Sequence, residues 1–491
     1  MEPRFRSVGR DQQFLLPPDV REWLPAGHPA LFVSELVGSL DLSVFVEAYR
    51  STPDRGRPAY HPIVMVGVVL YASMTAVLSS RRIERLLATD AGFRVVAANE
   101  RPDHVTICRF IVRHRDALQG LFAQVVGLAA EAGLVDPTLV AVDGTKMAGD
   151  ASKSRNENLG DLRARFGDWA DTVEANDAED DAAEQADPSP GPVPEMFERE
   201  SMRDWIRRRL AERAEESDDR RMNVTDPDSG LLPRSGGGWV QGYNAQAAAV
   251  IGGIVVAGEV TANPADCTML EPMVRRIGDA VQAATGEPAG VVVADAGYWD
   301  SDTINTIDAD DELADVLIAT GRRQPDQVPE PLPEPDLTSY ETALADHQAA
   351  LDAERDRRIT VISGVVNGEL LLRDAAEQLD ISVPRVGELK LAWQAGAGPD
   401  AVPRQRLAGP RPPKAPTRAA HSRHAMDSRL ASPAGRSFYR QRQAIIEPVF
   451  GDLKTNRRLN RFLRRGIDKI RTEWHWMLIG HNLTIIHKHS G

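Results

Sequence analysis

The fold of this chain is constrained most strongly by two short runs of β-branched and apolar residues. Each run is followed by an aspartate and soon by a glycine. Residues 140–142 lead into Asp143, and residues 291–294 lead into Asp295. Such short apolar runs are typical of buried strands in an α/β sheet. Ligands and metals gather at the carboxyl ends of strands in these sheets. An isolated Asp-Gly is more often a turn, so each aspartate indicates a site only together with the other.

A third acidic residue, Glu447, lies in a stretch that has the periodicity of an amphipathic helix. At about 100° per residue, one half of that helix carries Tyr439, Arg442, Ile446, Glu447, Phe450 and Lys454. A carboxylate on this face can hold a divalent cation, and the cations around it can hold phosphate oxygens. A core helix with an exposed ion pair would explain the same pattern. Pro448 is expected to kink the helix beside Glu447.

Two aspartates at strand ends and one helical glutamate make an oxygen-rich set that suits Mg²⁺ or Mn²⁺. The two cysteines, Cys108 and Cys267, lack zinc-site spacing, and their small number indicates a reducing compartment. The N-terminal residues lack the apolar segment of a signal peptide, and the apolar run at 63–78 is short for a membrane span. We therefore expect a cytoplasmic protein without a membrane partner.

The segments around the three acidic residues resemble the signatures of DDE transposases from bacterial insertion sequences. The matching text is AVDGTK at Asp143, ADAGYW at Asp295 and YRQRQAIIEPVFGDLK at Glu447, supported by GYNAQAAAV at 242–250 and RFLRRGIDKIRTEW at 461–474. The segment at Glu447 looks like the Tyr-Arg-Glu-Lys signature of that family. Four residues separate Arg442 from Glu447, where the commonest form of the signature has three, whereas the gap of six residues to Lys454 fits.

The resemblance implies metal-dependent DNA strand cleavage and strand transfer of an insertion sequence. Asp143, Asp295 and Glu447 would be the catalytic residues and would hold two Mg²⁺ or Mn²⁺ ions per active site. The residues expected to bind DNA are Tyr439, Arg442, Lys454, Lys146, Tyr298 and Trp299, the last two by stacking on an unpaired base. The partners would be double-stranded DNA, both the element's terminal inverted repeats and the target, bound by a dimer.

The distribution of charge agrees with a nucleic-acid partner, although the net charge of the chain is −14. Residues 401–491 contain 19 basic and 5 acidic residues, which leaves a charge of −28 for residues 1–400. Such asymmetry is expected of a DNA-binding surface on an otherwise acidic protein.

The expected fold class is α/β, with a ribonuclease-H-like catalytic core, a helical N-terminal domain and a mostly helical insertion before the last catalytic helix. Strands at 139–142, 243–250, 254–261, 290–294 and 316–319, with helices near 269–284 and 302–307, follow the ribonuclease-H-like order. We expect four regions: 1–135, helical and binding transposon ends; 136–321, the first part of the core with an acidic linker at about 154–235; 322–435, an inserted domain; and 436–491, the last part of the core with basic helices.

The inserted domain contains a segment at 373–393 that resembles a helix-turn-helix, with Asp380 at the turn position. This segment is either a DNA reader or a small helical packing unit. Two alternatives to a transposase also remain at this stage. One is a related metal-dependent nuclease that cuts DNA without joining it. The other is a catalytically inactive DNA-binding regulatory protein.

Overall fold

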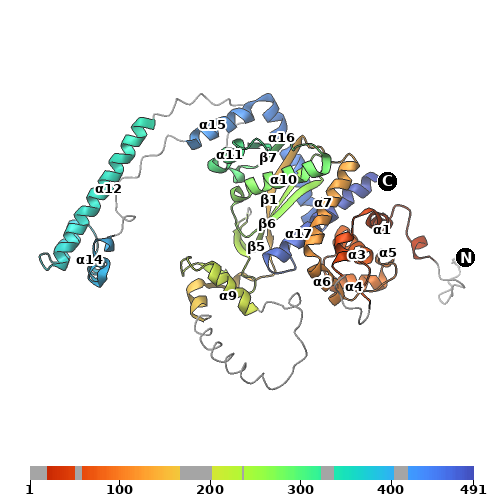
Figure 1. Cartoon of the computed structure of the whole chain (residues 1–491), viewed down its shortest axis with the longest axis horizontal. Coiled ribbons are helices and arrows are strands. Elements are labelled where there is room, and N and C mark those ends of the chain that lie inside the picture. The colour runs from red at the N-terminus through yellow and green to blue at the C-terminus, as the bar shows by residue number, and fades with distance from the viewer. Residues whose placement is uncertain are drawn as a thin grey trace, which may run out of the picture. The chain divides into compact units, whose positions relative to one another are not determined.

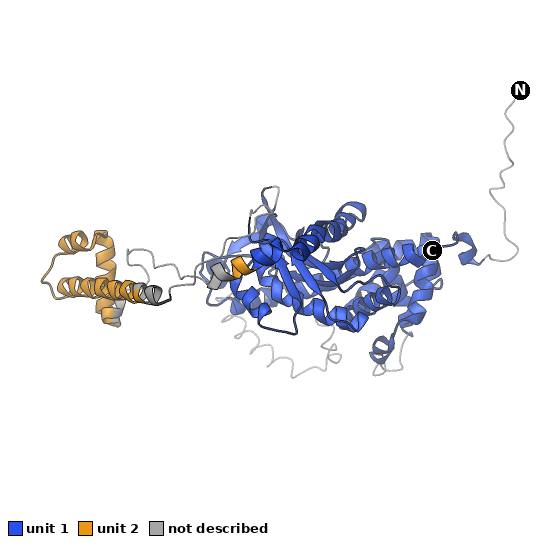
Figure 2. Cartoon of the chain, turned by 90° about the horizontal axis from the view of Figure 1, so that it is seen from above, with its two compact units in different colours: residues 1–327, 426–491 blue, residues 328–425 orange. Residues whose placement is uncertain are grey.

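The computed structural model describes residues 19–49, 58–165, 202–234, 237–321, 337–402 and 418–490. It divides into two compact units, one made of residues 1–327 and 426–491 and the other of residues 328–425 (Figure 2). Of the acidic linker expected at about 154–235, residues 166–201 lie outside the described residues, and the described remainder contains secondary structure. The fold is mixed α/β, as expected from the sequence.

The first unit is built on a mixed six-stranded sheet. Its strands are β1 (Leu139–Ala148), β4 (Gly230–Pro233), β5 (Trp239–Val250), β6 (Val255–Thr261), β7 (Val291–Ala294) and β8 (Asp315–Ile318). The order across the sheet is β4-β5-β1-β7-β8, and β6 also pairs with β5. Strands β1, β7 and β8 are parallel, whereas β4, β5 and β6 join as antiparallel neighbours. Strand β1 extends six residues beyond the predicted 139–142 because its second half pairs with β5.

The connections follow local sequence signals. Gly252 and Gly253 turn the β5–β6 hairpin with φ of 92° and 84°, values that glycine adopts without steric cost. Helix α10 (Leu270–Thr285) crosses from β6 to β7 and ends at Gly286, a left-handed cap with φ of 77°. Helix α11 (Ser301–Asp308) then connects β7 to β8, and Asp300 caps it by accepting a hydrogen bond from the Thr303 N–H at 2.9 Å.

The N-terminal part of this unit is helical. Its elements are η1 (Val20–Trp23), α1 (Pro29–Ser39), α2 (Ser43–Glu47), α3 (Pro62–Met74), α4 (Ser80–Thr89), α5 (Ala91–Val96), α6 (His104–Arg113) and α7 (Arg115–Glu131). Helix α3 accounts for the apolar run, since nearly all of its residues are buried. No helix in the described ranges is long and apolar enough to cross a bilayer.

Two long C-terminal helices pack against the sheet. Helix α16 (Pro433–Gly451) continues through Pro448 and contacts β1, β5 and β7. Helix α17 (Ile467–Ser490) lies between β6 and the N-terminal helices α3 and α7 (Figure 1). Its Trp474 is fully buried and donates from Nε1 to the Gln246 carbonyl at 2.8 Å, so this indole belongs to the core.

Arg457 connects these two helices to the N-terminal part. It follows a π-turn (Asp452–Asn456) that ends α16, and its side chain is 7% exposed. The guanidinium donates to Asp452 Oδ2 at 2.6 Å, to the carbonyls of Ser73 and Met74 at the end of α3, and to the Gly480 carbonyl of α17. One buried cation therefore satisfies acceptors on three helices, which fixes the end of α16.

The second unit is helical and is described by itself. It contains α12 (Leu337–Val366), α13 (Leu372–Leu379), α14 (Val383–Ala392) and the short turns Trp393–Ala397 and Gly398–Ala401. Asp380 makes the turn between α13 and α14 in the left-handed region, with φ of 52° and ψ of 46°. Residues 337–402 contain eleven acidic and six basic residues. The net charge of these described residues is therefore −5.

A small sheet and helix lie beside the main sheet, namely β2 (Asn156–Asn158), β3 (Arg221–Asn223) and α9 (Met202–Glu212). The turn after β3 holds Asp226, which is fully buried. Its carboxylate accepts from the Tyr243 hydroxyl at 2.8 Å and from the Gly466 N–H at 3.1 Å, so it joins β5 to the start of α17. Burial raises the pKa of Asp226 to about 6.

The Asp226→Asn variant tests this arrangement through the pH dependence of stability. A folded-state pKa above the unfolded value of about 3.9 means that the folded chain binds the proton more tightly. The contribution of wild-type Asp226 to the free energy of unfolding should therefore fall by roughly 3 kcal/mol as pH rises from about 4 to about 6. Urea unfolding at several pH values should show this fall in wild type and a flatter profile in the variant. Asp279→Asn, at an exposed position on α10, should keep the wild-type profile, and an unchanged profile in Asp226→Asn would refute the assignment.

Candidate active site

The parallel pairing of β1 with β7 brings two of the predicted aspartates together. Ala141 pairs with Val293, so Asp143 and Asp295 stand two residues further along each strand, at adjacent positions. The Gly144 N–H donates to Asp143 Oδ1 at 2.7 Å, and the Gly297 N–H donates to Asp295 Oδ1 at 2.8 Å. The backbone thus orients both carboxylates.

The charge state of Asp143 reflects its surroundings. Burial raises the pKa of Asp143 to about 6, and the nearby negative charges of Asp295 and Asp266 act in the same direction. The Gly144 N–H and the Arg442 guanidinium oppose this rise. Closely spaced, partly buried carboxylates with raised pKa values are a common feature of catalytic sites.

Helix α16 covers the face of β1 that carries Asp143. Asp143 is opposite Ala247 and Thr145 is opposite Ala245 in the antiparallel ladder with β5, so all four side chains share one face. The two alanines are small and fully buried, which leaves room for the helix to approach. The same face therefore meets the inward side of α16.

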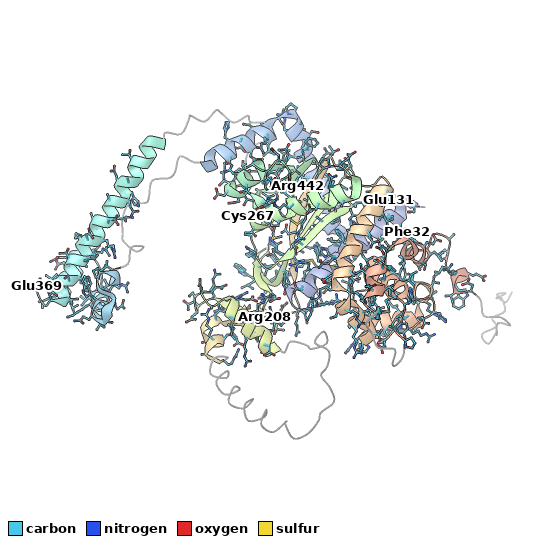
Figure 3. The ribbon with its side chains drawn as sticks, viewed as in Figure 1. Phe32, Glu131, Arg208, Cys267, Glu369 and Arg442 are labelled. Carbon is cyan, nitrogen blue, oxygen red and sulfur yellow. The ribbon has the colours of Figure 1, made fainter. Side chains whose placement is uncertain are left out.

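Two cations reach this face, Arg442 from α16 and Lys454 from the π-turn that follows it. Arg442 Nη1 lies 3.6 Å from Asp143 Oδ2, and the side chain is only 12% exposed where α16 crosses the strands (Figure 3). Its Nε and Nη1 atoms have no hydrogen-bond partner within the described part of the chain. Lys454 Nζ donates to the Thr145 hydroxyl, and burial lowers the pKa of Lys454. Tyr439 is half-buried near Arg442 and Asp295, and burial raises its pKa.

Glu447 lies on α16, between these two cations in the sequence. It is exposed, and it makes no hydrogen bond or ion pair with the residues that the structure describes. No three His, Cys, Asp or Glu side chains of the described residues are placed to hold a metal ion together. The structure thus joins Asp143 to Asp295 and leaves Glu447 apart, on the same helix as Arg442.

The opposite face of β1 holds an acidic residue that the sequence did not reveal. Asp266 accepts from Lys146 Nζ at 2.9 and 3.0 Å, so this ammonium is engaged and is not free for a phosphate. Asn244 Nδ2 and Gln246 Nε2 donate to the same carboxylate at 2.7 and 3.0 Å. Two amides two residues apart, beside the alanines of β5, were the available signal, because buried amides need partners.

The aromatic pair after Asp295 does not form a stacking platform in this conformation. Tyr298 is fully buried, and its hydroxyl donates to Gln246 Oε1. In this conformation the ring lies in the core, and its stacking on an unpaired base stays a prediction. Trp299 is half-buried and packs against the core.

Comparison with known families gives two matches. The family model described as Transposase domain (DUF772) matches residues 18–113, and the one described as Transposase DDE domain matches residues 413–487. The first spans the helices η1 to α6, and the second spans α16 and most of α17. Neither range includes Asp143 or Asp295. No curated protein and no solved structure matches the chain.

Gly144→Ala is expected to disturb the polar face of β1. A Cβ at Gly144 would lie 2.8 Å from Asp266 Oδ1 and 3.0 Å from Asn244 Oδ1, and nearer still to Gln246 Nε2. The neighbouring side chains would have to shift to avoid these contacts, and this should lower the free energy of unfolding by about 1–3 kcal/mol. Gly120→Ala, on an exposed turn of α7 with nothing within 4 Å, should instead raise it by about 0.5–1 kcal/mol. Denaturant unfolding of both variants measures the contrast, and equal effects would contradict the crowding at Gly144.

Proposed function

Because the chain is a DDE transposase of the insertion-sequence type, we propose that it cleaves and joins DNA strands at the site built around Asp143 and Asp295. The observation that carries this proposal is the parallel β1–β7 pairing, which sets these two aspartates side by side beneath α16. Glu447, on that helix, is the proposed third acidic residue. The DNA would be the terminal inverted repeats of the element and the target, and joining two ends calls for at least a dimer on DNA.

The sheet supports a ribonuclease-H-like core. Without the extra strand β4, the order β6-β5-β1-β7-β8 corresponds to the third, second, first, fourth and fifth strands along the chain. The first, fourth and fifth strands are parallel, and the second is antiparallel to both of its neighbours, the first and the third. A late helix, α16, lies on one face of the sheet. We propose that residues 136–321 and 436–491 form this core, and that the second unit is part of an insertion at 322–435.

The donor set fits a hard divalent cation. Asp143 and Asp295 offer carboxylate oxygens, the ligands that Mg²⁺ and Mn²⁺ prefer. A bound cation would also neutralise the negative charges that cluster around Asp143. We propose Asp143, Asp295 and Glu447 as the residues that hold two such ions. When bound, the ions would supply charge neutralisation for the attacking and leaving oxygens of an in-line displacement.

The residues of α16 would hold the DNA backbone at this site. Arg442 lies in ion-pair range of Asp143, and its buried Nε and Nη1 atoms make no hydrogen bond within the described residues, so these donors suit phosphate oxygens. Lys454 brings a second positive charge to the same face through its contact with Thr145. Tyr439, near Arg442, would complete the phosphate contacts. These groups orient the scissile phosphate and offset its negative charge, so no covalent enzyme intermediate is needed.

Three substitutions test the chemistry: Asp143→Asn, Asp295→Asn and Glu447→Gln. Each should reduce Mg²⁺-dependent cleavage of a labelled duplex carrying the DNA that flanks this gene by about 10³-fold or more, because the carboxylates act as a unit. Binding to the same duplex in chelator should stay within a few-fold of wild type. Asp279→Asn, at an exposed position on α10, should cleave normally.

The outcomes separate the competing functions. Retained cleavage in one variant removes that residue from the site, which matters most for Glu447 because of its exposed position. Cleavage without products of strand transfer identifies a nuclease. Tight binding by the wild-type protein, with no cleavage in Mg²⁺ or Mn²⁺, identifies a DNA-binding protein without catalysis.

The N-terminal helices offer a surface for transposon-end DNA. Helices α4 and α6 are joined by the His104 Nδ1–Glu84 Oε2 pair at 2.8 Å and by the Cys108–Ser80 contact at 3.2 Å. The exposed side chains of α4 include Arg81, Arg82 and Arg85, and those of α6 include Val105, Cys108, Arg109 and Val112 on one face. The exposed face of α6, with one arginine and small apolar groups, could lie in a DNA groove and contact base edges. The three arginines of α4 beside it could then contact phosphates.

Replacing Arg81, Arg82 and Arg85 together by Gln should weaken binding to the flanking duplex. If all three contact phosphates, the slope of log K against log salt should become shallower by up to about 3. Fluorescence anisotropy at several salt concentrations gives this slope. Arg385→Gln, on α14 of the second unit, should leave it unchanged. The reverse result would assign DNA binding to the helix-turn-helix-like segment instead.

A further inference from the structure

We propose that Asp266 is a positioning residue of the catalytic centre, which fixes the loop that carries Asp295 relative to β1. This inference rests on the proposed function for its catalytic consequence. Asp266 lies between β6 and α10 in a short 3₁₀ turn (Asp266–Met269). Its side chain is 21% exposed, and its partner Lys146 is 18% exposed.

Four hydrogen bonds converge on this carboxylate. Oδ1 accepts from Lys146 Nζ, Asn244 Nδ2 and Gln246 Nε2, and Oδ2 accepts from Lys146 Nζ. Asn244 and Gln246 are fully buried, so without Asp266 they would lose an acceptor that water cannot easily replace.

The network continues to the second aspartate. Gln246 donates to Asp266 with its amide nitrogen and accepts from the Tyr298 hydroxyl with its oxygen. Tyr298 is the third residue after Asp295, in the 3₁₀ turn Ala296–Tyr298 that Asp295 itself caps. Asp266 Oδ2 also lies 3.4 Å from the position of a Cβ at Gly297, so the loop rests directly against this carboxylate.

The other end of the network is on β1. Lys146 is three residues after Asp143, and Gly144 between them leaves the space that Asp266 and the two amides fill. Asp266 thereby links the strand of the first aspartate, the central strand β5 and the loop of the second aspartate. Catalytic groups need such fixed separation, since a shift of about 1 Å can cost about 10²-fold in rate.

Two other roles fit the geometry less well. As a metal ligand, Asp266 would need free lone pairs, but Oδ1 already accepts three hydrogen bonds. As a simple partner for the Lys146 charge, it would not need the two amides or the contact with the Asp295 loop. The convergence of donors from separate elements favours positioning.

The test combines Asp266→Ala, Lys146→Met, the double variant and Gln246→Ala, with Asp279→Ala as the exposed control. Hydrogen exchange of the metal-free protein, read by mass spectrometry, reports on the peptide 291–300 without depending on activity. In Asp266→Ala this peptide should exchange about tenfold faster or more, while α16 and α7 stay near wild type. Gln246→Ala should reproduce the change with Asp266 intact, and Asp279→Ala should not.

The double variant separates positioning from charge pairing. It removes the buried ammonium that Asp266→Ala leaves unpaired, so its thermal midpoint should recover. The fast exchange of 291–300 should nevertheless persist, because Gln246 still lacks its acceptor. Recovery of slow exchange in the double variant, or no change of exchange in Asp266→Ala, would overturn the proposal. Uniformly faster exchange across the whole sheet in Gln246→Ala would also overturn it.

Activity gives the catalytic part of the test. Asp266→Ala should lower the Mg²⁺-dependent cleavage rate by about tenfold or more, with DNA affinity in chelator unchanged. A loss of DNA affinity with a normal cleavage rate at saturation would contradict positioning. If the wild-type protein does not cleave DNA at all, the proposed function fails, and the exchange results still decide whether Asp266 holds the Asp295 loop.

Discussion

The active site depends on the parallel pairing of two short strands. Residues 139–141 of β1 lie beside residues 291–293 of β7, and these strands are buried on both faces. Parallel strands bring their carboxyl ends to the same edge, so the residues that follow the paired stretch meet there. The helix α10 makes the crossover between the two halves of the sheet, which this pairing requires.

Helix α16 then determines which groups face the two aspartates. Small alanines on β5 let the helix lie close to the sheet, and Arg457 fixes its end against α3 and α17. The helix contributes cations to the carboxylates from one side, through Arg442 and Lys454. Arg457 also donates to the carbonyls at the end of α3. It therefore connects the N-terminal helices to the helix that covers the catalytic face.

The two faces of β1 have different electrostatic roles. The face toward α16 carries Asp143 beside Arg442, whose Nε and Nη1 atoms make no hydrogen bond within the described residues, a setting that favours an anionic or metal-bound partner. The opposite face carries a closed network in which the Asp266 carboxylate satisfies Lys146 and two amides. Alternation of side chains along the strand makes this separation possible, since Asp143 and Lys146 fall on opposite sides. One face is thus available for chemistry, and the other holds the loop of Asp295.

The sequence by itself determined the five strands of the core and the two aspartates at the strand ends, because strand and helix periodicity are local and chain direction fixes which residue ends a strand. The strands β2, β3 and β4 were not predicted. The sequence also indicated the turn at Asp380. Tertiary structure alone decided that Asp266, 120 residues after Lys146, joins the site, since no local pattern encodes that contact. It also decided that Arg442 rather than Glu447 faces Asp143, because the rotation of α16 is set by packing on the alanines of β5 and not by helical periodicity.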